Sequence, residues 1–166
     1  AKGAANISNR AYAGRVNNLF FRGSGEYKAG VDNALSPGVW FGGQSNDQLI
    51  LEFRLINGTN EVVTVDDVAI NEWVNVTFNV AGKVVNIYIN GKLEKSIMLS
   101  MAAKHPGKGF GLYVGRVDKG FPGEMAYLQY YSSALGSRRI EDIYAYYKRK
   151  LDEFMENVNY WIINGK

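Results

Sequence analysis

The chain has 166 residues, of which 46% are hydrophobic and 21% charged. This length is enough for one sizeable core and short for two domains. Its net charge of +3 is small and its basic residues are scattered apart from Lys148–Lys150, which argues against a nucleic-acid-binding protein. The absence of cysteine excludes disulfides, thiolate metal ligands and cysteine nucleophiles, and no stretch approaches the ~18 apolar residues of a membrane-spanning helix. Because the chain begins at Ala1 rather than Met, we expect it to be a fragment or a processed product.

Short strands separated by turn residues are predicted over the first 70 residues. Residues 1–18 are expected to form a loop followed by a weak edge strand. Four further strands are predicted, each bounded by Gly, Pro or Asn: Leu19–Arg22, Val39–Phe41, Leu49–Leu55 and Glu61–Val65. The last two face each other across Asn57-Gly58, a dipeptide typical of hairpin turns.

Residues 71–97 carry the strongest strand pattern in the chain. Apolar residues alternate with polar ones from Val74 to Val80 and again from Val85 to Ile89, the period of a half-buried strand. Ala81-Gly82-Lys83 predicts the first reversal, and Asn90-Gly91 predicts the second because both residues accept positive φ. Three antiparallel strands in this stretch indicate an all-β domain.

The remaining β elements follow the same spacing. Residues 100–108 are predicted to be a loop holding His105, the single histidine, and strands are predicted at Phe110–Arg116 and Met125–Tyr131. Strands recurring every 8–12 residues are typical of a β-sandwich.

The C-terminal part has a helical period. Apolar residues fall three or four apart from Ile140 to Phe154, which predicts an amphipathic helix of roughly 20 residues with Ser137 as its N-cap. Acidic residues three to four positions after Lys148–Lys150 are expected to form ion pairs on its exposed face. We therefore divide the chain into a sandwich, residues 1–136, and a helix with its tail, residues 137–166, packed on the sandwich or on a partner.

Several of these segments together resemble a known family. They are a Trp that opens a strand (Trp73), the Ile87-Tyr-Ile89 strand before Asn90-Gly91, the strand Gly111–Gly115, the Phe121–Gln129 turn and strand, and the closing Tyr131–Leu135 segment. Their order over approximately residues 39–145 resembles a laminin-G-like, concanavalin-A-like lectin/glucanase domain. The resemblance implies an antiparallel jelly-roll β-sandwich, a fold that hosts lectins, adhesion modules and glycan-cleaving enzymes. The helix departs from the family because it continues well beyond one or two turns.

Carbohydrate recognition requires exposed aromatic rings for stacking next to polar hydrogen-bonding groups. The candidates on predicted strands and loops are Tyr27, Trp40, Tyr113, Arg116 and Tyr127. The alternative for Trp40 and Trp73 is packing in the core or on the sheet.

A metal site is restricted by the residue types available. With one His and no Cys, zinc and copper sites are nearly excluded. Calcium requires only oxygen ligands, and Asp32, Asp47 and Asp118 lie in predicted loops that could meet at one rim. The alternative is that these residues only form turns.

Three functions are compatible with the sequence. The first is a non-catalytic carbohydrate-recognition or adhesion module at a cell or virion surface. The second is a structural or assembly domain of a viral particle or surface complex, with self-association through the C-terminal helix. The third, a polysaccharide lyase or hydrolase, is disfavoured because no pair of carboxylates is spaced to face one side of a strand, and we expect no enzyme activity.

Overall fold

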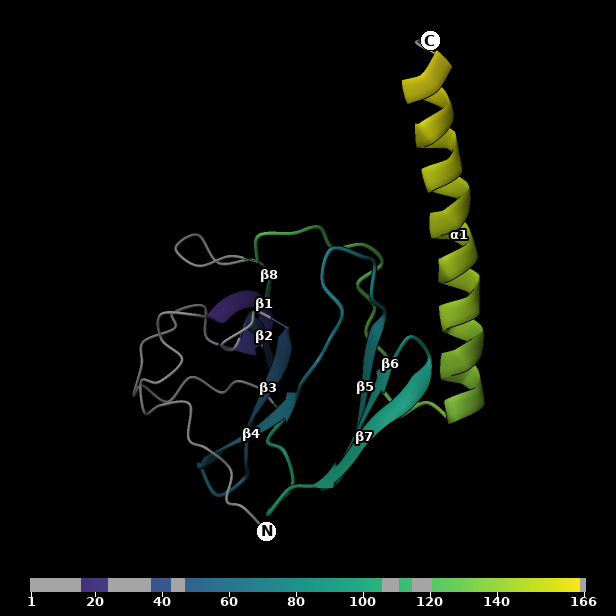
Figure 1. Cartoon of the computed structure of the whole chain (residues 1–166). Coiled ribbons are helices and arrows are strands. Elements are labelled where there is room, and N and C mark those ends of the chain that lie inside the picture. The colour runs from purple at the N-terminus through teal and green to yellow at the C-terminus, as the bar shows by residue number, and fades with distance from the viewer. Residues whose placement is uncertain (1–15, 24–36, 43–46, 106–110, 115–120, 165–166) are drawn as a thin grey trace.

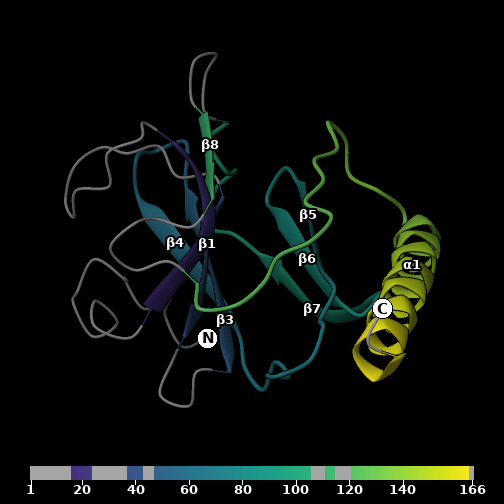
Figure 2. The ribbon, with the colours of Figure 1, turned by 90° about the horizontal axis from the view of Figure 1, so that it is seen from above.

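Two antiparallel β-sheets lie face to face in the computed structural model, which describes residues 16–23, 37–42, 47–105, 111–114 and 121–164, with side chains as far as residue 156. The described residues form three layers, namely a five-stranded sheet, a three-stranded sheet and a helix (Figure 2). This arrangement confirms the predicted antiparallel sandwich.

The five-stranded sheet contains the N-terminal strands and one late strand. Its strands are β1 (Val16–Gly23), β2 (Gly38–Gly42), β3 (Gln48–Arg54), β4 (Asn60–Val65) and β8 (Gly111–Val114), in the order β4-β3-β2-β1-β8. All four early strand predictions from residue 19 to residue 65 are confirmed, and Gly58 has the positive φ of 84° expected at the β3–β4 turn. Of residues 1–18, for which we expected a loop and a weak edge strand, residues 16–18 belong to β1 and residues 1–15 lie outside the described ranges.

The three-stranded sheet is the predicted run of hairpins. It consists of β5 (Val76–Ala81), β6 (Val84–Ile89) and β7 (Lys92–Met98), in that order. Asn90 and Gly91 have φ values of 50° and 77°, and Gly82 has 60° at the other turn. Both turns were therefore predicted correctly, although β5 begins two residues later than the alternation suggested.

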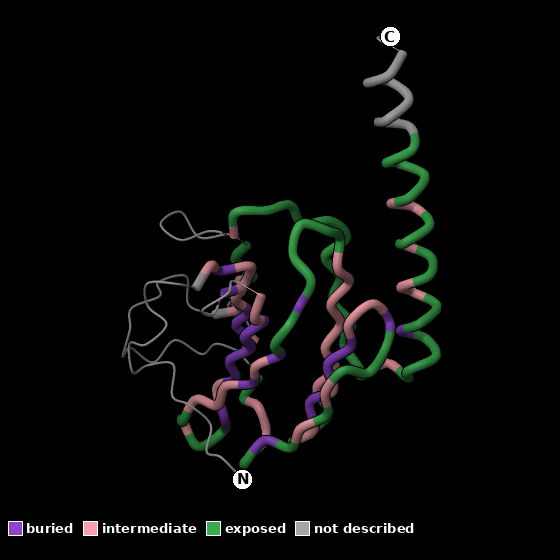
Figure 3. The backbone as a smooth tube through the Cα atoms, in the orientation of Figure 1, coloured by how far each residue is buried: buried purple, intermediate pink, exposed green. Residues whose placement is uncertain are grey.

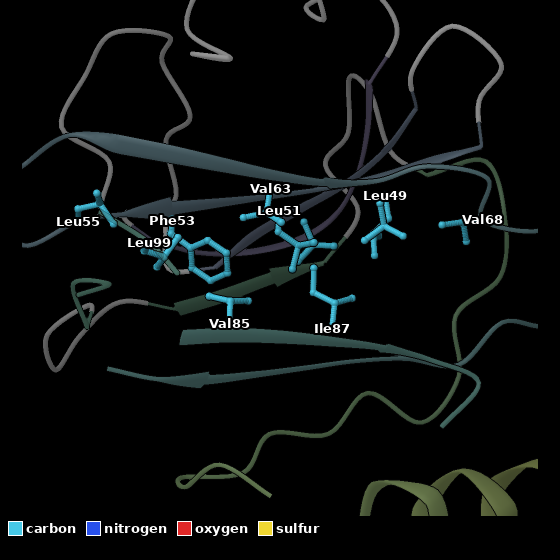
Figure 4. Close-up of a cluster of buried hydrophobic side chains, with 11 residues drawn as sticks. Leu49, Leu51, Phe53, Leu55, Val63, Val68, Val85, Ile87 and Leu99 are labelled. Atoms are coloured by element: carbon cyan, nitrogen blue, oxygen red, sulfur yellow. The ribbon is translucent and has the colours of Figure 1, made fainter. Parts of the chain in front are cut away.

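The hydrophobic core lies between the two sheets. Its largest contributions come from β3, whose Leu49, Leu51 and Phe53 face Val85 and Ile87 of β6 (Figure 4). Phe20 of β1 extends the core by stacking on Phe78 of β5, with ring centroids 6.1 Å apart. The alternating strand pattern of the sequence thus produces one apolar layer enclosed by both sheets.

Helix α1 (Ser137–Asn164) covers part of the outer side of the three-stranded sheet and then continues past the sandwich (Figure 1). The Ile140 amide donates to the Gly136 carbonyl at 3.2 Å, so the helix is capped one residue before the predicted N-cap, Ser137. At 28 residues it is longer than the predicted 20.

The outward side of α1 is charged, as the sequence predicted. Lys148 pairs with Asp152 at 2.7 Å and Lys150 pairs with Glu153 at 3.0 Å, both in exposed positions where solvent weakens the attraction. Most described residues of the helix are exposed (Figure 3). No described helix is long and apolar enough to cross a membrane.

The strand predicted at Met125–Tyr131 is wrong. Residues 121–136 run along the sandwich without pairing to a strand, and Tyr127 has a φ of 55°, which a regular strand cannot contain. The segment is tied to the three-stranded sheet by the Asn79 side chain, which donates to the Leu135 carbonyl at 2.6 Å and accepts from its amide at 3.2 Å.

Candidate functional site

Three aromatic rings lie across the outer face of the five-stranded sheet, the face that points away from the core. Phe21 of β1 is the register partner of Gly38 on one side and of Tyr113 on the other. The rings of Phe21 and Tyr113 stack at 5.0 Å, and Trp40 lies two residues from Gly38 on the same face. We call Trp40, Phe21 and Tyr113 the aromatic row.

Two glycines allow the outer rings of the row to lie against the sheet. A Cβ atom at Gly38 would come within 2.1 Å of the Trp40 six-membered ring, and one at Gly111 would come within 3.2 Å of the Tyr113 ring. Each ring therefore leans over the glycine two residues before it. Tyr113 is 41% exposed and Trp40 is half-buried, whereas Phe21 between them is 3% exposed, so the two outer rings are the ones on which a flat ligand can stack.

A β-bulge brings the middle ring onto this face. The register of β1 against β2 shifts between Asn18 and Phe20. Because a one-residue shift reverses the side of the sheet on which later side chains lie, Phe20 points into the core and Phe21 points outward. Without the bulge, Phe20 would lie opposite Gly38 on this face and Phe21 would point into the core.

Polar side chains of β3 and β4 continue the row. Glu52 is the register partner of Gly38 and is 3% exposed. Its Oε1 accepts from Asn60 Nδ2 at 2.6 Å, and Asn60 Oδ1 accepts from Arg54 Nη1 at 3.0 Å. Glu52 Oε2 has no hydrogen-bond donor within the described part of the chain, and neither has Asn18 Oδ1. Both oxygens belong to buried residues, since Asn18 is 6% exposed.

Burial raises the pKa of Glu52 above its ordinary value of 4.5, against the opposing effects of the Asn60 hydrogen bond and the nearby Arg54 charge. A carboxyl whose pKa is raised by folding stabilises the protein below pH 4.5, and this contribution is lost as the pH rises through the raised pKa. Because Gln does not ionise, we expect Glu52→Gln to avoid this loss. The free energy of unfolding of the variant, relative to that of the unsubstituted chain, is therefore expected to increase as the pH rises.

The measurement is the free energy of unfolding in urea at a series of pH values for both proteins. Glu94→Gln, at an exposed position of β7, controls for the loss of one negative charge. A stability difference between Glu52→Gln and the unsubstituted chain that stays constant with pH would contradict a raised pKa of Glu52.

A second aromatic region lies between the sandwich and the helix. Residues Trp73, Met125, Tyr127, Leu151 and Phe154, with Glu124 and Ala126, line a groove of about 530 Å³ that we call the helix groove. Tyr127 is 53% exposed and Trp73 is 40% exposed. This groove is mostly apolar, and Glu124 is the single charged residue among the described residues that line it.

The structure brings together two of the five predicted sugar-binding residues. Trp40 and Tyr113 share the aromatic row, whereas Tyr127 lies in the helix groove. Tyr27 and Arg116 are outside the described residues. Trp40 does not lie in the core, but it packs on the sheet over Gly38, as the alternative interpretation expected, and Trp73 is 40% exposed.

Of the predicted calcium ligands, only Asp47 is described. Its carbonyl accepts from the Val68 amide at 2.8 Å, which anchors the start of β3, while Asp32 and Asp118 lie outside the described ranges. Within those ranges, no three acidic or histidine side chains converge on a common point where a metal could bind.

Comparison with known proteins agrees with the fold. The family model described as the concanavalin A-like lectin/glucanases superfamily matches residues 8–141, which is most of the chain. A search of curated proteins finds no match. The matched region spans both sheets and ends within the first turns of α1, so the rest of the helix extends beyond it. The chain therefore belongs to the concanavalin A-like lectin/glucanase superfamily.

Proposed function

We propose that the chain is a non-catalytic carbohydrate-recognition module of a protein at a cell or virion surface, with the aromatic row as its saccharide platform. The observation that carries this proposal is the row itself, in which Trp40 and Tyr113 lean over glycines on one sheet face. A sugar ring has apolar C–H faces that stack on aromatic rings and hydroxyl groups that need acceptors. Half-buried Asn60 and Arg54, which lie beside the buried Glu52, supply polar partners at one end of the row.

The same face favours binding over cleavage. Glycoside hydrolysis by the common mechanisms uses two carboxylates placed across the scissile bond. Among the described strand residues on this face, Glu52 is the one carboxylate, and its neighbours across β2 and β4 are Gly38 and Val62. A single buried acid fits a structural or binding role. Release of reducing sugars or of unsaturated products from a polysaccharide would contradict this part of the proposal.

A glycan array identifies the ligand class and tests the row. We expect the unsubstituted chain to bind a saccharide and Tyr113→Ala to weaken that binding by about 1 kcal/mol or more, which is roughly fivefold in affinity, because one stacked ring is lost. Tyr146→Ala is the matched control, since Tyr146 is similarly exposed but lies on α1. Equal loss in both variants, or none in either, would contradict a site at the row.

Calcium is a further element of this proposal. Asp32, Asp47 and Asp118 lie in loops predicted from the sequence, and their carboxylates are the candidate oxygen ligands for the ion. The array is therefore performed with calcium and with a chelator. A requirement for calcium would support a metal site at these loops, and unchanged binding would contradict it.

An assembly function is the second candidate. It is favoured by α1, which continues past the sandwich with Phe154 59% exposed and Met155 40% exposed (Figure 1). An exposed apolar strip on a helix is a common site of association with another helix. A chain that binds no saccharide but associates through α1 would fit this function.

A further inference from the structure

Three stretches of the chain match the acceptor motif for N-linked glycosylation, which is Asn-x-Ser/Thr with any residue except Pro in the middle. They begin at Asn6, Asn57 and Asn75. The motif needs two side chains, the Asn amide that receives the saccharide and the hydroxyl two residues later. Matches this short also arise by chance, so the structure has to show which of them presents both groups at the surface. Asn6 lies outside the described residues.

The motif at Asn57 forms the tight turn between β3 and β4. The Leu55 carbonyl accepts from the Gly58 amide at 2.9 Å, and the Leu55 amide donates to the Thr59 carbonyl at 2.8 Å. The positive φ of Gly58, 84°, lets the chain reverse between these two bonds. Asn57 and Thr59 are both exposed. The turn lies at the end of the sandwich opposite the projecting part of α1, so a saccharide attached here stays clear of the helix (Figure 1).

The two side chains of this motif are already held together. Asn57 Oδ1 accepts from the Thr59 amide at 3.1 Å and from the Thr59 hydroxyl at 2.9 Å, which is the geometry of an Asx turn. Both groups that the motif requires therefore lie on one side of the turn. The two bonds orient the amide through its oxygen and leave Nδ2 with its two protons. Within the described part of the chain, no group accepts a hydrogen bond from this nitrogen.

The motif at Asn75 is part of the three-stranded sheet. Asn75 and Thr77 are half-buried. The Asn75 amide donates to Asn90 Oδ1 at 2.9 Å, the Asn90 amide donates to the Asn75 carbonyl at 2.9 Å, and Thr77 is the register partner of Tyr88 in β6. An enzyme that modifies this motif would have to separate its backbone from the neighbouring strand and turn. The folded chain therefore protects Asn75 and presents Asn57.

The β3–β4 turn can keep its structure when the Asn57 nitrogen carries a substituent. The Ile56 amide donates to the Ala102 carbonyl at 3.1 Å, and the Lys104 amide donates to the Arg54 carbonyl at 2.6 Å. The neighbouring segment thus holds the turn from the side through backbone bonds. None of these bonds, and neither bond to Oδ1, uses Nδ2. A saccharide attached to this atom adds bulk without removing a contact.

We propose that the folded chain is an acceptor for N-linked glycosylation at Asn57. In the transfer, Asn57 Nδ2 forms a bond to the anomeric carbon of a saccharide that is carried on a lipid pyrophosphate. The bond from this carbon to the pyrophosphate oxygen breaks, the lipid pyrophosphate leaves with the electron pair, and one Nδ2 proton passes to a carboxylate of the transferase. The product carries a bulky, hydrophilic group at the end of the sandwich.

This inference uses the surface location proposed above, because N-linked glycosylation takes place on secreted and surface proteins. It does not use the aromatic row. A chain that binds no saccharide on the array can still be glycosylated at Asn57, and a chain that is not glycosylated can still bind saccharide at the row. The two proposals therefore fail separately.

The test supplies the purified, folded full chain with a eukaryotic oligosaccharyltransferase and chitobiose linked to a lipid pyrophosphate. Peptide mapping by mass spectrometry then measures the fraction of Asn57 and of Asn75 that carries the disaccharide. We expect modification at Asn57 and a lower occupancy, or none, at Asn75. An unmodified Asn57, or an occupancy of Asn75 as high as that of Asn57, would overturn the proposal.

Three variants test whether the motif itself is responsible. Asn57→Gln and Thr59→Val are each expected to lose the modification at position 57, because the first removes the acceptor amide and the second removes the hydroxyl. Thr77→Val is the matched control, since it removes the same hydroxyl from the motif at Asn75, and we expect its Asn57 to be modified like that of the unsubstituted chain. Circular dichroism verifies that each variant is folded. Full modification of Thr59→Val, or loss of modification in folded Thr77→Val, would overturn the assignment to this turn.

Discussion

Leu51→Ala is expected to lower the free energy of unfolding by about 2–5 kcal/mol, a large part of the roughly 5–15 kcal/mol that stabilises a domain. Leu51 lies at the centre of β3 with 0% of its surface exposed, in contact with the core between the two sheets (Figure 4). The cost has two parts, because the substitution removes buried methyl groups and leaves a cavity that both sheets would have to close.

Leu93→Ala is the matched control for this prediction. It removes the same atoms from β7, where the Leu93 side chain is 55% exposed, and surface changes of this kind usually alter stability by about 0.5 kcal/mol or less. Urea unfolding followed by circular dichroism measures both variants. Similar losses in the two proteins would contradict a core that lies between the sheets at Leu51.

Gly91→Ala is expected to have the second largest effect, because it combines backbone strain with a steric conflict at the helix. Gly91 has a φ of 77°, a conformation that costs a residue with a Cβ atom about 1–2 kcal/mol. The new methyl group would also lie 2.9 Å from Tyr144 Cδ1, so α1 would have to move away from the β6–β7 turn. Overpacking of this type adds about 1–3 kcal/mol.

Gly82→Ala separates these two contributions. Gly82 occupies the β5–β6 turn with a φ of 60°, but no atom lies within 4 Å of the position of its Cβ. We expect this variant to lose only the strain energy. The comparison is made by urea unfolding and by the near-ultraviolet circular dichroism of the tyrosines, which reports on packing of the helix. Equal losses at both glycines would contradict docking of α1 at this turn.

The hairpins could be predicted because their signals are local. Asn90-Gly91 specifies a turn with two positive φ values whatever surrounds it, and the alternating residues before and after it define which side faces the core. The same reasoning failed at Met125–Tyr131. A strand needs a neighbour to accept its hydrogen bonds, and an apolar segment of suitable composition does not reveal whether a sheet edge is available.

The candidate site was only partly predictable for a related reason. Trp40 and Tyr113 were identified from residue type, and the pattern Gly-x-aromatic at both places is a signal that could have linked them. Phe21 was missed because its outward orientation depends on a bulge that no pattern in the sequence indicates. Glu52 was not among the predicted site residues, because its partner Asn60 lies across the β3–β4 turn and the two come together only in the folded hairpin.

The helix illustrates how far periodicity can be used. Spacings of three and four predicted an amphipathic helix and its ion pairs correctly. The sandwich covers only the first part of the apolar stripe, and this division follows from the position of the β6–β7 turn against Tyr144. A one-dimensional pattern indicates an apolar face, and the tertiary structure shows which part of it the sandwich covers.

The most direct test of the saccharide platform uses the three tryptophans, which lie in three different places. Trp40 belongs to the aromatic row, Trp73 lines the helix groove, and Trp161 lies in the last turns of α1. Their indole N–H signals, assigned by Trp→Phe substitutions, are followed by nuclear magnetic resonance while the saccharide selected by the array is added. We predict that the Trp40 signal shifts with saccharide concentration and that the Trp73 and Trp161 signals stay in place. A shift of Trp73 with no change at Trp40 would contradict binding at the row.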